Sequence, residues 1–291
     1  MSAYWGLLIA VIAVSWSSIF IRWCGDVPAL VISFYRLLWS TLLFLLYQLL
    51  ANPRSLTYPH LTKKSKLLIF LAGILLALHF GTWIASVQNT LISHALILGS
   101  IHPVFALLLS PLFLKERGSW LTVLAAAVTL MGIVLIGGQD FHLTGSKFIG
   151  DLLAVISALF VTIYILIARH QRQNIDFIPY LIAVYAIAAL TLFFMILLFQ
   201  LPIFQYSLRA HLFMLFLALI PTGIGHTLIN WAARRIEIYK VNFSILGEPV
   251  ISSVLAYIFF GEKPYGLFYL GALFIIGGIL LALTERKSGK F

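Results

Sequence analysis

Long apolar runs alternate with short polar stretches along this chain, and ten of the runs are about 20 residues long. An α-helix of that length spans the hydrocarbon core of a bilayer. Because lipid offers no water to backbone N–H and C=O groups, we expect each run to be helical, and the runs are too continuous for alternating barrel strands. The expected spans are Trp5–Trp23, Ala29–Leu50, Leu67–Ser86, Ile92–Leu114, Ser119–Ile136, Phe148–Ala168, Ile178–Gln200, His211–Ala233, Val241–Phe260 and Tyr265–Thr284.

A pattern of proline, glutamate and glycine positions occurs twice among these spans. In each copy a proline lies inside an apolar run, an acidic-basic turn follows, and the next apolar run has glycine near its end. The matched positions are Pro103 with Pro249, Glu116 with Glu262, and Gly132 with Gly278. We interpret this pattern as two copies of one five-helix unit, residues 1–138 and 139–291.

Composition and charge agree with a membrane protein. Of the 291 residues, 62% are apolar and only 10% are charged, which is far from the composition of soluble domains. The net charge of +10 comes from basic residues between the apolar runs, so it indicates membrane orientation and not nucleic-acid binding. With the N-terminus inside, fourteen lysines and arginines fall on the inner side and four on the outer side. We therefore expect both termini in the cytoplasm.

An odd number of helices in each repeat has a consequence for topology. The second half must cross the membrane in the sense opposite to the first, which predicts two inverted repeats. In transporters with inverted repeats the binding site lies at the repeat interface, near the bilayer midplane. The sequence thus predicts an all-α, multi-pass protein of the inner membrane with ten transmembrane helices, which we expect to be a monomer surrounded by lipid.

Polar side chains inside the spans mark candidate site residues. An ionisable group at membrane depth costs at least a few kcal/mol, so its presence suggests a use. Residues three, four, seven or eight apart share a helix face, and several expected helices carry such polar stripes. The alternative is structural, since Ser and Thr often bond their own backbone, and arginine can extend to the membrane surface. The candidates on these stripes are Arg36, His79, Trp83, His102, His226, Asn230, Glu248 and Ser252.

Three of these residues are also candidates for coupling transport to protons. Glu248 lies about two turns into its span, and a desolvated carboxylate there is suited to reversible protonation. The alternative for Glu248 is a structural tie to Arg36 or to a histidine. His79 and His226 occupy matching positions in the two halves, and histidine readily exchanges a proton.

Prolines and aromatic residues complete the candidate set. Pro103, Pro221 and Pro249 should bend their helices and serve as hinges, because proline removes a donor and clashes with the carbonyl four residues back. Trp16 and Tyr164, in the first span of each half, are candidates to frame an organic substrate together with Trp83. Most membrane aromatics are instead packing or interface residues.

Arg36, the Pro103-Val104 to Glu116-Arg117 segment and the Glu248-Pro249-Val250 to Glu262 segment together suggest a family. In these pieces and their order, the chain resembles the EamA-type ten-helix members of the drug/metabolite transporter superfamily. The resemblance covers nearly the whole chain. It implies a transporter of amino acids, other metabolites, nucleotide sugars, sugars or quaternary ammonium compounds, and it does not choose among these substrates.

These observations predict a secondary transporter that works by alternating access on a small polar metabolite. An amino acid or derivative is favoured because Arg36 and Glu248 offer opposite charges. The first alternative is a cationic or quaternary ammonium metabolite held by aromatic faces and Glu248. The second is a polytopic membrane enzyme, although the remaining acidic residues are scattered singly. No cofactor or metal is expected, since the sequence has neither a phosphate-binding glycine loop with lysine nor metal-ligand spacing.

Overall fold

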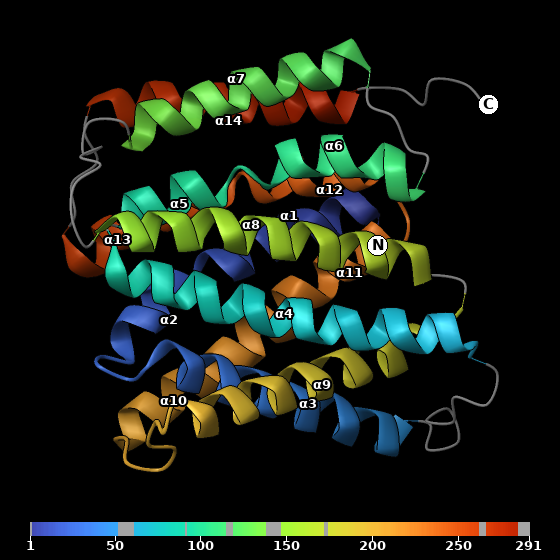
Figure 1. Cartoon of the computed structure of the whole chain (residues 1–291). Helices are drawn as coiled ribbons and strands as arrows, with labels where there is room; N and C mark the ends of the chain where they lie inside the picture. Colours follow the sequence, from blue (N-terminus) through green and yellow to red (C-terminus); the bar gives the residue numbers. More distant parts are fainter. Residues whose placement is uncertain are drawn as a thin grey trace.

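The computed structural model describes residues 2–51, 61–90, 92–114, 119–137, 147–171, 174–261 and 266–284, and their regular elements are all helices. Seven helical segments are long and apolar enough to cross a membrane, and three apolar helices are shorter. The helices lie side by side along one common direction (Figure 1). They are α1 (Ala3–Ser15), α2 (Ser17–Trp23), α3 (Ala29–Ala51), α4 (Lys63–Asn89), α5 (Ile92–Gly99), α6 (His102–Leu114), α7 (Trp120–Gly137), α8 (Lys147–His170), α9 (Phe177–Leu198), α10 (Leu208–Leu217), the π-helix η4 (Ala218–His226), α11 (Thr227–Ala233), α12 (Ile238–Ile245), α13 (Glu248–Phe260) and α14 (Gly266–Thr284).

The all-helical prediction is confirmed for the described residues, and helices cover the ten apolar runs. The seven long segments and three short helices do not by themselves establish ten membrane crossings, so that count stays a prediction. The Lys115-Glu116-Arg117 turn and the Glu262-Lys263 turn, which helped to define the repeat, lie outside the described residues.

Several apolar runs expected as single helices are divided into shorter ones. The first run changes helix at Trp16, the fourth changes between α5 and α6, and the ninth changes between α12 and α13. The eighth run passes through η4, whose wider π-turns contain Pro221. At π-turns and helix breaks, some backbone N–H and C=O groups lie outside the regular α-helical hydrogen-bond pattern. Such irregularities occur frequently at functional sites.

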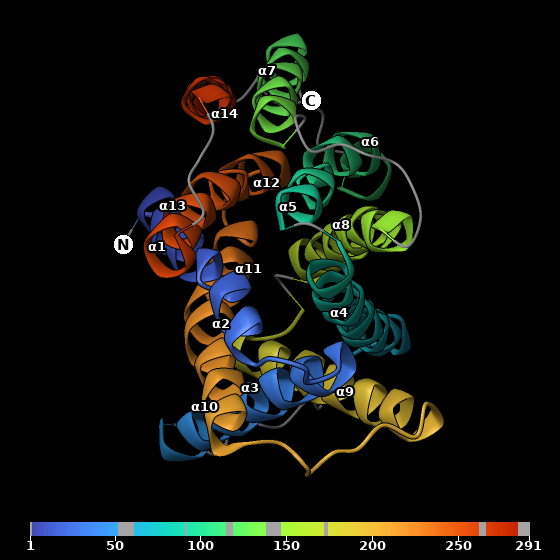
Figure 2. The same cartoon turned by 90° about the vertical axis from the view of Figure 1, so that its left-hand side faces the viewer.

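The packing joins helices from the two halves of the sequence. The main pairs are α4 with α8, α3 with α9, α7 with α14, and α1 with η4 and α11 (Figures 1 and 2). The first to fifth apolar runs correspond to the sixth to tenth. If each run is replaced by its counterpart, the same set of helix pairs results: the α4–α8 pair becomes the pair of α1 with η4 and α11, and the other two pairs are unchanged. The pairing is therefore what two related five-helix halves would give, although the inverted orientation itself stays a prediction.

The α7–α14 pair lies at one edge of the molecule, away from the central helices (Figure 2). Two glycines at the matched repeat positions allow this close contact. A Cβ on Gly132 would lie 2.5 Å from the Gly271 carbonyl oxygen, and a Cβ on Gly278 would lie 2.0 Å from Thr129 Oγ1. Small residues at such contacts let membrane helices pack backbone against backbone.

The outer surface is apolar, as a lipid-facing surface must be. Large apolar side chains such as Trp120, Leu112 and Phe194 are mostly exposed on this surface, where lipid tails and not water would surround them. The interior holds buried polar side chains together with the apolar core, among them Arg36, His79, His102 and His226. These ionisable side chains therefore gather in the interior of the bundle, and the apolar ones cover its outer surface.

Candidate functional site

A cavity at the centre of the bundle is bounded by helices of both sequence halves. Its volume is about 70 Å³, and α3, α4, α6, α8, η4, α12 and α13 all contribute to its walls. Six of the ten residues predicted to bind substrate line this one cavity. They are Arg36, His79, Trp83, His102, His226 and Glu248.

Arg36 reaches the cavity from α3 and is only 1% exposed. Its Nε donates to Thr222 Oγ1 at 2.5 Å and its Nη1 donates to Ser17 Oγ at 3.2 Å. Its Cζ lies 4.0 Å from the centre of the Phe80 ring, a cation–π contact. A guanidinium has five N–H donors, and these two bonds use two of them. Arg36 therefore does not extend to the membrane surface, and it has donors left for an anionic ligand.

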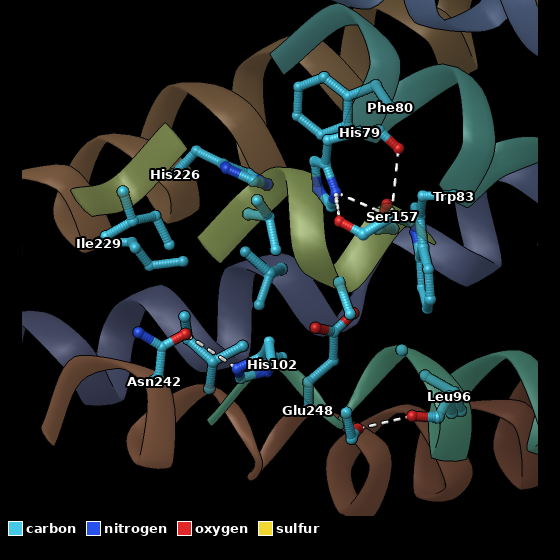
Figure 3. A pocket seen from close by; sticks show the side chains of 18 of the residues that line it. His79, Phe80, Trp83, Leu96, His102, Ser157, His226, Ile229, Asn242 and Glu248 are labelled. Carbon is cyan, nitrogen blue, oxygen red and sulfur yellow. Dashed lines mark hydrogen bonds between the residues drawn. The ribbon is translucent and has the colours of Figure 1, made fainter. Parts of the chain in front are cut away.

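Glu248 is the first residue of α13, and its side chain points into the cavity towards the α8 wall that holds Ser157 (Figure 3). Within the described part of the chain, Glu248 forms neither an ion pair nor a hydrogen bond. The structural alternative, a permanent tie to Arg36 or to a histidine, is therefore absent there. A carboxylate without a partner in a low-dielectric interior calls for a proton or a cationic ligand.

The predicted histidine pair meets in this cavity. The ring centres of His79 and His226 are 6.0 Å apart, and His226 packs edge-on against Phe80 at 4.9 Å. The Nδ1 of His79 lies 3.1 Å from the Ser157 carbonyl oxygen and 2.8 Å from Ser157 Oγ (Figure 3). The Nδ1 of His226 is buried and has no hydrogen-bond partner among the described residues.

His102 faces the same cavity from α6. Its Nδ1 lies 3.0 Å from Asn242 Oδ1 on α12, so one hydrogen bond joins the fourth and ninth apolar runs (Figure 3). Both residues are buried. The contact joins the two helix breaks that border the site, since α6 begins at His102 and α12 ends a few residues after Asn242.

The prolines lie at these helix breaks, in a geometry that differs from the expected one. Pro103 and Pro249 were expected to bend continuous helices by clashing with the carbonyl four residues back. In the structure they occupy the first turn of α6 and α13, where a missing N–H costs no hydrogen bond. Pro221 lies inside η4. The breaks place His102 and Glu248 at helix starts beside the cavity, and hinge motion at the prolines stays a prediction.

The other four predicted residues do not line the cavity. Asn230 donates to the Tyr164 hydroxyl at 2.6 Å in a fully buried contact between α11 and α8. Ser252 donates to the Ser15 carbonyl oxygen at 3.1 Å. Trp16 stacks against Phe20 with ring centres 5.6 Å apart and also packs on Phe259. Asn230 and Ser252 share helix faces with cavity residues, but neighbouring helices cover them.

Most residues of the cavity wall were not predicted, among them Ser157, Asn242 and Phe80. Ser157 and Asn242 are polar residues within apolar runs, so their position in a span was a usable signal. Phe80 is apolar in an apolar run, and nothing in the sequence distinguishes it. The cation–π contact between the Phe80 ring and Arg36 follows only from the packing of α3 against α4.

Known proteins with similar sequences are transporters. The model of the EamA-like transporter family matches residues 1–138 and 148–284. The uncharacterized transporter YdfC of Bacillus subtilis is 26% identical over 272 residues, which cover 89% of this chain and 83% of the relative. A probable terminal-alkyne amino-acid exporter of Streptantibioticus cattleyicolor is 27% identical over 204 residues, 67% of this chain and 65% of the relative. One solved crystal structure, at 19% identity, has the same fold, with a TM-score of 0.81 and 99% of each chain covered.

Proposed function

The chain belongs to the EamA-like transporter family, and we propose that it carries a small metabolite with both a carboxylate and an amine, such as an amino acid. It is a multi-pass protein of the inner membrane, and it is a transporter, as its relatives are named. The substrate class, the route and the coupling are the parts that we propose. The route is the central cavity, opened to one side of the membrane at a time.

One observation carries the choice of substrate. Arg36 and Glu248 line the same cavity, and the described residues contain no ion pair between them. Buried charges without partners are unfavourable in a low-dielectric interior. A zwitterion whose carboxylate binds Arg36 and whose ammonium binds Glu248 would satisfy both. The S. cattleyicolor relative, named as a probable amino-acid exporter, supports the same class.

The runner-up is a cationic or quaternary ammonium metabolite held by aromatic faces and Glu248. The cavity is less suited to it, because the Phe80 face already contacts the Arg36 guanidinium. Of the three aromatic residues predicted to frame a substrate, only Trp83 lines the cavity, whereas Trp16 and Tyr164 do not. A cation would also bring a like charge close to Arg36.

Alternating access is supported by the way the cavity is built. Its walls come from both halves of the chain, and several wall segments begin or end at helix breaks beside Pro103, Pro221 and Pro249. Two inverted halves of five helices, with both termini inside, would exchange openings by moving one set of helices against the other. Only a difference in substrate affinity between the two states biases that exchange.

The test is uptake into liposomes that contain the purified protein. Radiolabelled amino acids, nucleotides and choline-like cations are supplied, with and without a pH gradient. We expect saturable uptake of at least one amino acid, with competition by other zwitterions and weaker competition by the matching amine or acid. Uptake of choline-like cations alone would instead establish the runner-up, and a pH gradient that drives uptake would identify proton coupling.

A further inference from the structure

We propose that the amine of the substrate is a primary ammonium, bound by three acceptors: the Glu248 carboxylate and the Nε2 atoms of His79 and His102. Ser157 and Asn242 are positioning residues, because they fix the tautomer of each histidine. This inference rests on the proposed function in one respect, namely that the substrate has an amine. It goes further by stating which amines the cavity accepts.

The hydrogen bonds of Asn242 determine the proton position on His102. Asn242 Nδ2 donates to the Ile238 carbonyl oxygen at 2.9 Å, so the amide oxygen is the atom that faces His102. That oxygen lies 3.0 Å from His102 Nδ1 and can only accept. The proton of the neutral ring is therefore on Nδ1. Nε2 then has a free lone pair and acts as an acceptor.

His79 reaches the same state through different partners. Its Nδ1 lies 3.1 Å from the Ser157 carbonyl oxygen, which can only accept. Ser157 Oγ, 2.8 Å from the same Nδ1, directs its own proton to the His79 carbonyl oxygen at 3.2 Å. Nδ1 is thus the donor, and Nε2 of His79 is an acceptor. Helices α8 and α12, which are distant in the chain, impose the same tautomer on two cavity histidines.

The two Nε2 atoms are available to a ligand. Neither has a hydrogen-bond partner among the described residues, and neither is among the fully buried polar atoms without a partner, whereas His226 Nδ1 is. Glu248 also has no partner within the described part of the chain. The three side chains come from α4, α6 and α13 to one cavity (Figure 3).

Three acceptors match the three N–H donors of a primary ammonium. Each N-methylation replaces one N–H donor of the ammonium by a methyl group. The acceptor facing that methyl group is then desolvated by the bound substrate and receives no hydrogen bond. A buried acceptor left unpaired is costly, so every methyl group should weaken binding. A trimethylated ammonium has no N–H at all and would leave all three acceptors unpaired. The cavity should therefore select primary amines against quaternary ones.

The first test needs no variant. Competition for uptake into liposomes is measured with one transported amino acid and its N-methyl, N,N-dimethyl and N,N,N-trimethyl forms. We expect roughly a tenfold loss of affinity for each N–H replaced. Equal affinity across the series would overturn the inference, while transport of the parent amino acid would leave the proposed function intact. If no zwitterion is transported, the proposed function itself fails.

Variants then assign the effect to the histidines. His79→Phe and His102→Phe should each weaken the primary amine by roughly tenfold without weakening the trimethyl form, which no longer leaves that acceptor unpaired, so selectivity falls. His170→Phe is the matched control, because His170 is exposed at the end of α8, outside the cavity. Equal losses for both ligands would mean that the histidines only support the fold.

The positioning role of Asn242 has a spectroscopic readout. In protein with ¹⁵N-labelled histidine, protonated and unprotonated ring nitrogens have different chemical shifts, and His102→Phe identifies the His102 signals. We expect an unprotonated Nε2 in the wild type and in Asn242→Asp, which keeps an acceptor in place. Asn242→Leu should produce a mixture of tautomers and lower the selectivity for the primary amine. A protonated Nε2 on wild-type His102 would overturn the assignment.

Discussion

Replacing Arg36 by glutamine is expected to weaken binding of a carboxylate-bearing substrate by about 2 kcal/mol, which is roughly 30-fold in Kd. Three guanidinium N–H groups have no hydrogen-bond partner among the described residues, since Thr222 and Ser17 use two of the five. Hydrogen bonds from a charged group contribute about 1.5–3 kcal/mol. Glutamine is neutral and shorter, and it would retain a bond to Thr222 or Ser17 while losing the charge.

The assay compares two ligands that differ in one group. Kd is measured on purified protein for a transported amino acid and for the amine that remains after removal of its carboxylate. We expect Arg36→Gln to weaken the amino acid roughly 30-fold and to change the amine by less than about threefold. Arg209→Gln is the matched control, because Arg209 is exposed and lies over Phe213, away from the cavity.

Stability provides a check that the variant is folded. Arg36 is a buried cation with no carboxylate within ion-pair distance among the described residues, so its replacement breaks no close ion pair there. We expect the thermal midpoint of the ligand-free variant to stay at or above that of the wild type. Equal weakening of both ligands, or weakening of neither, would refute the assignment of Arg36 to the carboxylate.

Three further predictions test coupling, packing and topology. Glu248→Gln should flatten the dependence of transport on pH, because glutamine cannot exchange a proton; an unchanged rate and pH profile in liposomes would exclude a role in coupling. Gly278→Ala should lower the free energy of unfolding by about 1–3 kcal/mol, since its Cβ would lie 2.0 Å from Thr129 Oγ1. Gly277→Ala, whose Cβ would meet nothing within 4 Å, is its control in thermal unfolding, and equal midpoints would contradict the close α7–α14 contact. Reporter fusions at the two ends should both be protected from external protease, and exposure of either end would contradict the predicted orientation.

The sequence was sufficient for the parts of the structure that depend on local composition. A run of about 20 apolar residues has few alternatives to a helix in lipid, so the helical segments could be predicted within a few residues. The same physics identified Arg36, His79, His226 and Glu248, because an ionisable group in such a run is costly wherever its helix finally packs. These four residues do meet in one cavity.

The sequence did not show which polar residues reach that cavity and which are covered. Asn230 lies one helical turn from His226 on the same face, yet it bonds to Tyr164 on α8. Ser252 has the same relation to Glu248, and it bonds to the Ser15 carbonyl oxygen. Periodicity places a side chain on a helix face, but the neighbouring helix decides whether that face is open.

Helical periodicity and desolvation cost are properties of a single segment, so the sequence by itself determined the spans and the ionisable groups at membrane depth. The tertiary structure alone decided two other features: the Phe80 ring under Arg36, and the histidine tautomers set by Ser157 and Asn242. Each of these features requires contact between helices that are far apart in the chain. Such contacts depend on how whole helices pack, which no local pattern specifies.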